Sequence, residues 1–563
     1  MRAGGGIRRQ DAAHRQRPGL TEAVIVRNLI AAASLALAVA AHAAPRVAVL
    51  AHDPGYYTSL ANHAARWLKG EGIDAAVAAP SDMAKSLASA KVAFAIGFAE
   101  PSKSEVAELT SFVRRGGKLV VFYSASPALA SLMGVKPLGY KTAPYPGAWS
   151  RMDFDASTIP GCPRSILQTS TVLQRAAPVK GRSWTVANWM DRSGKATGDA
   201  AWIRSDAGFW MTHVFLADGD EAAKAQFLAA ICGAADPTLW NVAAFSARAR
   251  ARNEAMKALA LAQSPRKGEI HAVWDHSGCG IYPGNWKRTI ALLKESHVTD
   301  IFVNVAGAGF AHYPSSVLPR SKTFSQEGDQ LAQCLAAAKG SGIRVHAWIL
   351  CFTATRATPD VLEAFQKKGW RLKDRGGRLT EYLDPSNAAV RGRILAAADE
   401  ILARYRVDGI HLDFVRWYER SEKPKGAADV ITRFVAEMRG HVRRPCWLTT
   451  AVLGKYPACV ASVGQDWESW LSGNLVDYVV PMDYTESMPQ FESFLRQHSA
   501  SKAHARRTIA GIGVTANESR LDARGVIDQI NASRRHGLAG NALFDLDVTL
   551  EKQILPYLRL GMW

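Results

Sequence analysis

The segment RYRVDGIHLDFVRW, residues 404–417, decides the fold of this chain because a helix leads through it directly into a short apolar strand. The helical stretch begins near residue 390, and the strand that follows it carries Asp413 near its carboxyl end. A helix joined to an apolar strand by a short connection is the repeating unit of parallel α/β sheets. The same alternation should therefore recur on both sides of this segment.

The alternation recurs throughout the C-terminal half of the chain. Its eight strand-like runs cover residues 269–275, 300–307, 344–352, 407–415, 446–453, 476–484, 508–514 and 541–547. Helical segments such as NWKRTIALLKESH and DQLAQCLAAAKGSG lie between them. Eight βα units in roughly 300 residues predict a (β/α)8 TIM barrel over residues 267–563, with its functional site at the carboxyl ends of the strands.

A second α/β region precedes the barrel, over residues 45–235. Its strand-like runs are RVAVLA (46–51), DAAVAA (74–79), KVAFAIGF (91–98) and KLVVFYSA (118–125). Apolar strands separated by amphipathic helices predict a doubly wound parallel sheet covered on both faces, completed by a strand and helix over 208–232. Residues 236–266 predict a basic linker helix that packs between the two domains.

The composition is that of a folded globular chain. Of its 563 residues, 48% are hydrophobic and 21% are charged, which excludes a disordered protein. The formal net charge is +19, but the basic residues form scattered pairs such as Arg114-Arg115 and Arg506-Arg507. Without a basic run interleaved with aromatic residues, we expect no nucleic-acid binding. A basic surface suits an anionic cell envelope equally well.

Residues 1–44 are predicted to be an upstream extension followed by a secretory signal peptide. Arg27 precedes the apolar run LIAAASLALAVAA, and the small-residue site Ala41-His42-Ala43 predicts cleavage near Ala43. After residue 50 no window of 18 consecutive apolar residues occurs, so we expect no integral membrane segment once the signal is removed. These features predict a periplasmic or secreted protein.

The seven cysteines form no C-x-x-C pair, which argues against a zinc or redox site. Export to an oxidising compartment permits a disulfide. Cys162 and Cys232 are the two cysteines in the first half of the chain, so we expect them to pair. We expect no cofactor and no metal.

Acidic, polar and aromatic residues converge at the predicted strand ends. They are Asp275 and His276 on strand 1, Asn304 on strand 2, His346 and Trp348 on strand 3, His411, Asp413, Arg416 and Trp417 on strand 4, Asp483, Tyr484 and Glu486 on strand 6, and Asp545 on strand 8. Hydrolysis of a glycosidic bond requires two carboxyl groups, and sugar rings stack on aromatic side chains. Such a barrel mouth therefore suits a polysaccharide substrate.

Several motifs of the barrel occur in one order along the chain. They are Ala272-Val273-Trp274, His312-Tyr313-Pro314-Ser315, His346-Ala347-Trp348, Tyr382-Leu383-Asp384-Pro385, RYRVDGIHLDFVRW (404–417), GQDWESWL (464–471) and VDYVVPMDYT (476–485). Over about 269–550 they resemble the glycosyl-hydrolase-like family 10, exported bacterial barrel enzymes related to peptidoglycan-glycan and exopolysaccharide hydrolases. The resemblance implies a glycosidase that acts on a cell-envelope glycan, with Asp413 as the family's catalytic carboxylate. Many members have a second Asp directly after the first, where this chain has Phe414.

The N-terminal region resembles, more loosely, the class I glutamine-amidotransferase-like fold, which also occurs as a non-catalytic companion domain in glycoside hydrolases. The turn that would carry a nucleophilic cysteine reads Tyr123-Ser124-Ala125-Ser126-Pro127. Without that cysteine we expect no amidotransferase activity. For Ser124 we expect a helix N-cap.

The period of a β-strand places His411 and Asp413 on the same face of strand 4. Between Leu412 and Phe414, Asp413 should be desolvated, which would raise its pKa toward the range of a general acid. A structural ion pair with Arg416 is the competing interpretation.

The second carboxylate is predicted to be Asp483, because strand 6 lies two strands from strand 4. Asp275, Glu486 and Asp545 remain alternatives, and the spacing of the pair would decide between retention and inversion of configuration. The residues predicted to bind substrate are Asp275, Asn304, His346, Trp348, His411, Trp417, Tyr484 and Asp545. Two other functions stay open: a non-catalytic glycan-binding protein, and a scaffold that binds envelope proteins through its N-terminal domain.

Overall fold

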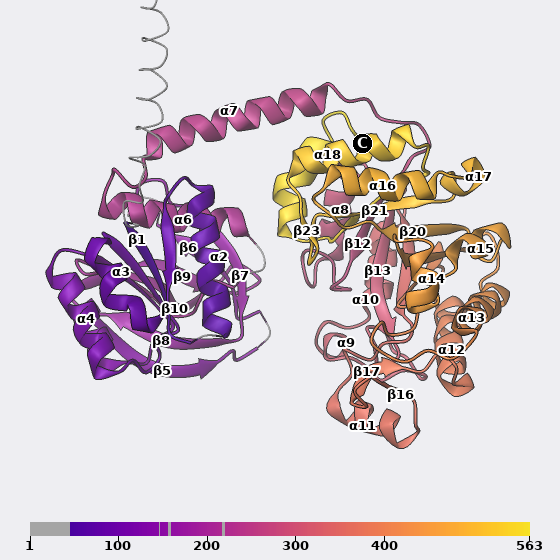
Figure 1. Cartoon of the computed structure of the whole chain (residues 1–563), viewed down its shortest axis with the longest axis horizontal. Helices are drawn as coiled ribbons and strands as arrows, with labels where there is room; N and C mark the ends of the chain where they lie inside the picture. Colours follow the sequence, from indigo (N-terminus) through magenta and orange to yellow (C-terminus); the bar gives the residue numbers. More distant parts are fainter. Residues whose placement is uncertain (1–45, 54, 146, 156–158, 217–219) are drawn as a thin grey trace, which may run out of the picture.

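The computed structural model describes residues 46–53, 55–145, 147–155, 159–216 and 220–563. The predicted extension and signal peptide over residues 1–44 lie outside this range. Two nine-stranded sheets form the centres of two domains, and helix α7 (Val242–Leu261) runs from one domain to the other (Figure 1).

Eight parallel strands close into a barrel in the C-terminal domain. In ring order they are β12 (Ile270–Asp275), β13 (Asp300–Gly307), β15 (Arg344–Leu350), β18 (Gly409–Asp413), β19 (Trp447–Leu453), β20 (Tyr478–Met482), β21 (Ile509–Gly513) and β24 (Gly540–Phe544). Strand β12 pairs with both β13 and β24, which closes the ring. The predicted TIM barrel is confirmed, and the same eight segments form its strands.

Helices surround the barrel between successive strands. They include α8 (Trp286–Glu295), α10 (Gln330–Ala338), α12 (Ala388–Arg404), α13 (Ala427–His441), α15 (Trp467–Ser472), α16 (Met488–His498) and α18 (Ala523–Arg535). Each strand sends alternate residues to opposite sides. In β18, Ile410 and Leu412 belong to the core between strands and helices, whereas the ring of His411 stacks on Phe302 inside the barrel. Asp413 shares the inward face with His411.

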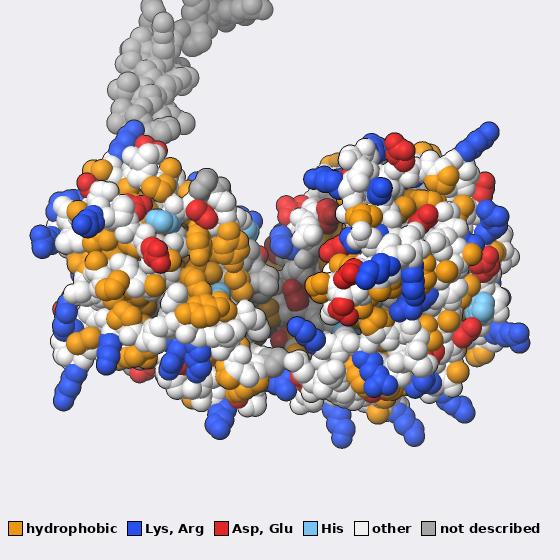
Figure 2. All heavy atoms as spheres, turned by 90° about the horizontal axis from the view of Figure 1, so that it is seen from below, with side chains coloured by type: hydrophobic (Ala, Val, Ile, Leu, Met, Phe, Trp, Pro, Cys, Tyr) orange, Lys and Arg blue, Asp and Glu red, His pale blue; other side chains and the backbone are white. Residues whose placement is uncertain are grey.

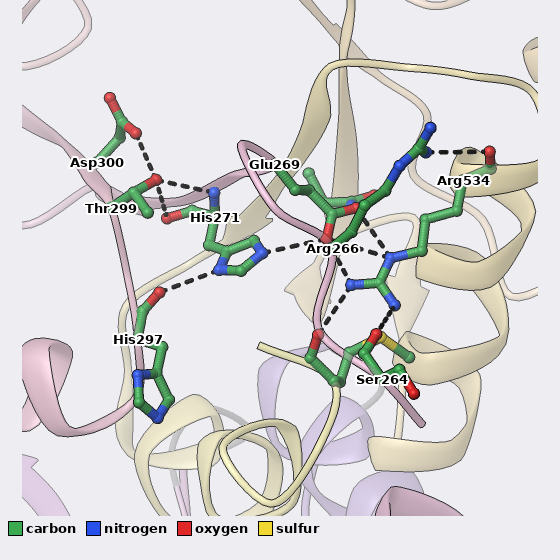
Figure 3. Close-up of polar contacts among 10 residues, drawn as sticks. Ser264, Arg266, Glu269, His271, His297, Thr299, Asp300 and Arg534 are labelled. Carbon is green, nitrogen blue, oxygen red and sulfur yellow. Dashed lines mark hydrogen bonds and ion pairs between the residues drawn. The ribbon is translucent and has the colours of Figure 1, made fainter. Parts of the chain in front are cut away.

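A polar network closes the amino-terminal end of the barrel (Figure 3). Glu269 accepts a hydrogen bond from Arg534 Nε at 2.9 Å and lies 3.1 Å from His271 Nε2. His271 Nδ1 donates to the backbone oxygen of His297 at 3.0 Å. Asp300, at the start of β13, forms an ion pair with Arg344 at 2.6 Å. These contacts hold the ends of the strands together opposite the predicted site.

The N-terminal sheet begins as a doubly wound parallel sheet, as predicted. Its parallel strands run in the order β2 (Ala75–Ala78), β1 (Val47–Ala51), β3 (Val92–Ile96), β4 (Lys118–Phe122) and β11 (Gly208–Met211). One face packs against α2 (Tyr56–Gly70) and α6 (Glu221–Ala235), and the other against α3 (Met83–Ser89), α4 (Lys103–Arg114) and α5 (Pro127–Met133). Each face has its own hydrophobic core.

The sheet continues into antiparallel strands that the sequence analysis did not identify. They are β10 (Ala196–Ser205), β9 (Ser183–Met190), β6 (Trp149–Phe154) and β7 (Ser165–Ser170), while β5 (Val135–Thr142) and β8 (Val172–Pro178) form a separate ribbon. In β7 buried residues alternate with partly exposed ones. Such half-exposed strands lack the continuous apolar runs by which buried parallel strands are found.

Three predictions about this half of the chain are wrong in detail. Cys162 and Cys232 do not form a disulfide, because Cys232 is enclosed in the core on α6 while Cys162 lies in a loop, and both are free thiols. The N-cap of α5 is Ser126 and not Ser124. The Oγ atom of Ser124 accepts a hydrogen bond from the backbone N–H of Ser126 at 3.1 Å. Helix α7 is largely exposed, with only Ala260 buried, so it does not pack along its length between the domains.

None of the helices in the described ranges combines the length and apolar character needed to cross a membrane.

Candidate active site

A cavity of about 450 Å³ opens at the carboxyl ends of the barrel strands. It is lined by Trp274, His276, Ser277, Trp348, Leu350, Thr355, Arg356, Asp413, Phe414, Arg416, Ala451, Met482, Tyr484 and Phe544. Its volume lies in the usual range for small-molecule sites. One carboxylate therefore faces a wall made largely of aromatic and apolar side chains.

Asp413 is the last residue of β18, and its side chain is buried in the wall of this cavity. Its Oδ1 atom accepts a hydrogen bond from the backbone N–H of Phe414 at 2.5 Å and lies 3.4 Å from the guanidinium of Arg416. Among the residues that the structure describes, Oδ2 has no hydrogen-bond partner. One oxygen of Asp413 is thus held in place while the other is available to a ligand.

Burial raises the pKa of Asp413, as the sequence analysis predicts. The positive charge of Arg416 and the N–H of Phe414 act in the opposite direction, because both favour the ionised carboxylate. The expected ion pair with Arg416 therefore exists, but at 3.4 Å it coexists with an oxygen that faces the cavity.

Phe414 directly follows the strand with a φ of 49°, in the left-handed region that a bulky side chain seldom adopts. Its ring lines the cavity, and the Arg416 guanidinium stacks over it at 4.0 Å. Backbone strain of this kind persists where the surrounding structure enforces it, often at functional sites. Here it turns the chain sharply beside the Asp413 carboxylate.

Tyr484 and Phe544 form the opposite wall, with their rings stacked at a centroid distance of 5.5 Å. Burial raises the pKa of Tyr484, and the carboxylates of Asp413 and Asp545 raise it further. Tyr484 thus lies within electrostatic reach of one carboxylate on β18 and one that directly follows β24. These two strands are four positions apart in the ring, on opposite sides of the barrel.

Asp545 directly follows Phe544 but does not itself line the cavity, and its Oδ1 accepts a hydrogen bond from Thr515 Oγ1 at 3.0 Å. Burial, reinforced by the nearby charge of Asp547, raises the pKa of Asp545 to about 7. An ordinary Asp has a pKa of about 3.9, so this carboxyl group keeps its proton to a higher pH than usual.

Asp545→Asn should change the pH dependence of stability. As the pH rises from about 4 to about 7, the unfolded chain releases the Asp545 proton while the folded chain keeps it, so the wild-type free energy of unfolding falls. Asn carries no such proton. We expect the variant to gain melting temperature relative to wild type between pH 4 and pH 8, measured by calorimetry. An unchanged difference across this range would contradict the raised pKa.

His411 lies one layer below Asp413 and does not line the cavity. Trp274 Nε1 donates a hydrogen bond to His411 Nε2 at 2.9 Å, so the ring proton is on Nδ1, which donates to Thr449 Oγ1 at 2.8 Å. Burial lowers the pKa of His411 well below its ordinary value. The neutral ring is a fixed support for Trp274 rather than a substrate ligand.

Asp483, the favoured second carboxylate, points away from the mouth. Its neighbours Met482 and Tyr484 line the cavity, so the strand period turns Asp483 outward, where it is fully buried. There its oxygens accept hydrogen bonds from His498 Nε2 on α16 at 3.0 and 3.1 Å. A carboxylate paired behind the barrel wall cannot reach a ligand in the cavity, and we do not retain it as catalytic.

Four further predicted substrate ligands are turned away from the cavity. Asp275 accepts hydrogen bonds from Ser277 Oγ at 2.6 Å and from the Gly280 N–H at 2.8 Å, so it shapes the loop after β12. The Asn304 amide donates to the backbone oxygen of His276 at 3.3 Å, which also supports this loop. The other two are His346, which contacts Asp300 at 2.8 Å near the closed end, and Trp417, which is buried and donates to Ala427 O at 3.1 Å. Glu486, the remaining alternative carboxylate, is exposed and accepts from the Arg520 N–H.

Residues 281–428 match the family glycosyl hydrolase-like 10. This span runs from the loop after β12 to the start of α13 and contains Asp413. The family predicted from the sequence is thereby confirmed for this part of the barrel. The match does not reach the N-terminal domain, whose resemblance to amidotransferase-like companion domains stays a prediction.

Several solved structures are similar to the chain at low sequence identity. The glycoside hydrolase domain of PgaB (BpsB) from Bordetella bronchiseptica is 15% identical over 52% of this chain and 98% of that chain, with a TM-score of 0.42. Alpha-L-fucosidase isoenzyme 2 from Paenibacillus thiaminolyticus is 14% identical over 52% of this chain and 48% of that chain, with a TM-score of 0.37. A GH18 chitinase from Cycas revoluta is 13% identical over 52% of this chain and 99% of that chain, with a TM-score of 0.35. No curated protein matches the chain.

The cavity residues that were not predicted to be catalytic or to bind substrate include His276 and Arg356. His276 follows β12 and lies against Trp348 and Phe544, at centroid distances of 5.8 and 5.7 Å. Arg356 donates to the His276 backbone oxygen at 3.3 Å and stacks over Phe310. The position of His276 at a strand end was a usable signal, whereas Arg356 lies in a loop with no distinguishing pattern.

The described residues contain no group of three or more His, Cys, Asp or Glu side chains arranged to hold a metal ion. A larger cavity, of about 670 Å³, lies at the closed end among Arg266, Lys267, Arg344 and other basic residues. Because functional sites of this fold lie at the carboxyl ends of the strands, the mouth cavity is the candidate active site.

Proposed function

We propose that this protein is a glycoside hydrolase that cleaves a bacterial cell-envelope polysaccharide, either a peptidoglycan glycan strand or an amino-sugar exopolysaccharide. The observation that carries the proposal is the position of Asp413, a buried carboxylate with one free oxygen in an aromatic cavity at the barrel mouth. This residue lies within the span that matches the glycosyl hydrolase-like family.

The walls of the cavity suit a carbohydrate. Trp348, Tyr484 and Phe544 present aromatic surfaces of the kind on which the apolar faces of sugar rings stack. The indole N–H of Trp348 is buried and has no hydrogen-bond partner among the described residues. A buried donor of this kind gains most when a ligand oxygen accepts from it.

Two buried carboxyl groups are the candidates for the acid and the base. Asp545, whose pKa is raised to about 7, keeps its proton near neutral pH and is the candidate general acid. Burial raises the pKa of Asp413, but Arg416 and the Phe414 N–H favour its carboxylate, and we assign it the role of base or nucleophile. This reverses the role that the sequence analysis expected for Asp413.

One observation favours a second function, that of a non-catalytic glycan-binding protein. Phe414 occupies the position where many members of the resembled family have a second Asp, and its ring fills part of the cavity wall. A barrel that has lost a reacting group keeps its aromatic surfaces and still binds a sugar. Export to the periplasm or beyond, inferred from residues 1–44, fits either function.

Incubation with defined glycans tests the proposal. Purified protein is incubated in H₂¹⁸O with N-acetylglucosamine oligosaccharides, their de-N-acetylated forms or peptide-free peptidoglycan strands. The products are then identified by mass spectrometry. We expect new reducing ends that carry ¹⁸O from at least one glycan. Tight binding without any new reducing end would support the binding protein instead. If the protein neither cleaves nor binds any glycan, an envelope scaffold would be favoured.

A further inference from the structure

A second cavity, of about 500 Å³, lies between the two domains. One side is formed by His63 and Arg66 of α2, and the other by residues 485–487 after β20 and 517–520 at β23 (Ser519–Arg520). Helix α2 lies on the side of the N-terminal domain that faces the barrel, and β23 lies on the barrel side that faces it (Figure 1). Figure 2 shows the surface hollowed between the two domains.

Ion pairs fix the N-terminal domain beside the mouth of the barrel. Glu221, at the start of α6, accepts a hydrogen bond from Trp67 Nε1 at 3.1 Å and lies 3.9 Å from Arg520 of the barrel. Two further pairs cross the interface, Asp220 with Lys552 at 3.3 Å and Arg192 with Glu327. The three barrel partners lie in short elements on the side of the mouth: Lys552 in a short helix after β24, Arg520 in β23 after β21, and Glu327 in α9 (Lys322–Glu327) after β13.

The interdomain cavity adjoins the candidate active site. Tyr484 lines the mouth cavity, and the next residue, Thr485, lines the interdomain cavity. Glu518 lines the interdomain cavity and also contributes, after burial, Asp413 and Asp545, to the raised pKa of Tyr484. The two cavities are therefore lined by consecutive residues, Tyr484 and Thr485, and the interdomain cavity is the space beside the mouth on this side of the barrel.

Most polar side chains of the interdomain cavity have partners within the protein, such as Arg66 with Glu221 at 3.4 Å, but three side chains offer further hydrogen-bonding atoms. His63 Nδ1 donates to the Ser59 backbone oxygen at 2.8 Å, which leaves its Nε2 lone pair free to accept. Asn517 and Glu518 are exposed and have no hydrogen-bond partner within the described part of the chain. Together they offer an amide donor, a carboxylate acceptor and an imidazole acceptor, a set that matches the hydroxyl and amide groups of sugars.

We propose that the interdomain cavity is an additional glycan-binding subsite for sugar units that extend beyond the barrel mouth. The inference rests on the proposed function, since the occupant is the same polysaccharide. The N-terminal domain then contributes to substrate selection by favouring long chains over short ones. His63 and Asn517, one from each domain, are its sugar ligands.

The test compares oligosaccharides of increasing length. The probe is the N-acetylglucosamine series, from the dimer to the octamer, in its acetylated and de-N-acetylated forms. We expect His63→Ala combined with Asn517→Ala to lower kcat/KM for the longest substrates by about tenfold, through KM, because two hydrogen bonds are lost. The shortest cleaved substrate should be unaffected. Asn62→Ala, an exposed neighbour on α2 outside the cavity, is the matched control and should change neither value.

An equal effect on short and long substrates, or none on either, would overturn the subsite while leaving the hydrolase intact. If wild type cleaves nothing, calorimetry measures octamer binding, and about tenfold weaker binding by the double variant supports the subsite without the hydrolase. Equal octamer affinity, or no binding by wild type, overturns it. Circular dichroism and melting temperature confirm that the variants fold.

Discussion

Asp413→Asn is expected to lower kcat for glycan cleavage by about 10³-fold or more while the melting temperature stays near that of wild type. The substitution removes the carboxylate that faces the cavity but keeps its shape, so the amide oxygen still accepts from the Phe414 N–H. Arg416 loses one partner but retains Glu419 at 3.7 Å. Reducing-end release and calorimetry measure the two quantities.

Asp483→Asn is the contrasting control, because it changes an equally buried carboxylate on the other side of the wall. Here the loss of a charge-assisted hydrogen bond from His498 should lower the free energy of unfolding by about 1–3 kcal/mol. Its kcat should stay within a few-fold of wild type. If Asp483→Asn abolished turnover with an unchanged melting temperature, the two residues would have to exchange roles.

The barrel could be predicted because its strands are apolar on both faces and alternate with helices, so each strand is a continuous run in the sequence. The same property hides which face points inward. In VDYVVPMDY (476–484) both alternating sets of residues contain apolar side chains, so either face could point inward. Only the closed barrel shows that Tyr484 lies inside and Asp483 outside. For strand 4 the shared face of His411 and Asp413 was predictable, but their depth was not.

Depth along the barrel axis explains the remaining errors in the candidate site. His346 and Trp348 share a face of β15, yet His346 reaches Asp300 near the closed end and Trp348 reaches the mouth. The two side chains are two residues apart along the strand, at about 3.3 Å per residue, and this distance separates the structural His346 from Trp348 in the cavity wall. The cavity between α2 and the segments after β20 and β21 is lined by residues hundreds of positions apart, and no local pattern encodes it.

Asp545→Asn is expected to lower kcat by about 10²–10⁴-fold for natural glycans, the usual contribution of a positioned general acid. The leaving oxygen of a sugar must be protonated as its bond breaks, and Asn has no proton to give. In wild type, kcat should fall as the pH rises through about 7, because Asp545 then ionises. The variant should lose this alkaline limb.

The nature of the leaving group separates this role from a structural one. An aryl glycoside whose phenol leaves as the anion needs no acid, so the variant should recover to within about tenfold of wild type on that substrate. Asp547→Asn is the matched comparison: this neighbouring carboxylate accepts from the Leu550 N–H at 2.9 Å, and removing its charge should shift the alkaline limb to lower pH without abolishing it. An equal loss on both kinds of substrate would instead assign Asp545 to holding Thr515 and the strand ends. The acid would then have to be sought among the titratable groups that line the cavity, such as His276.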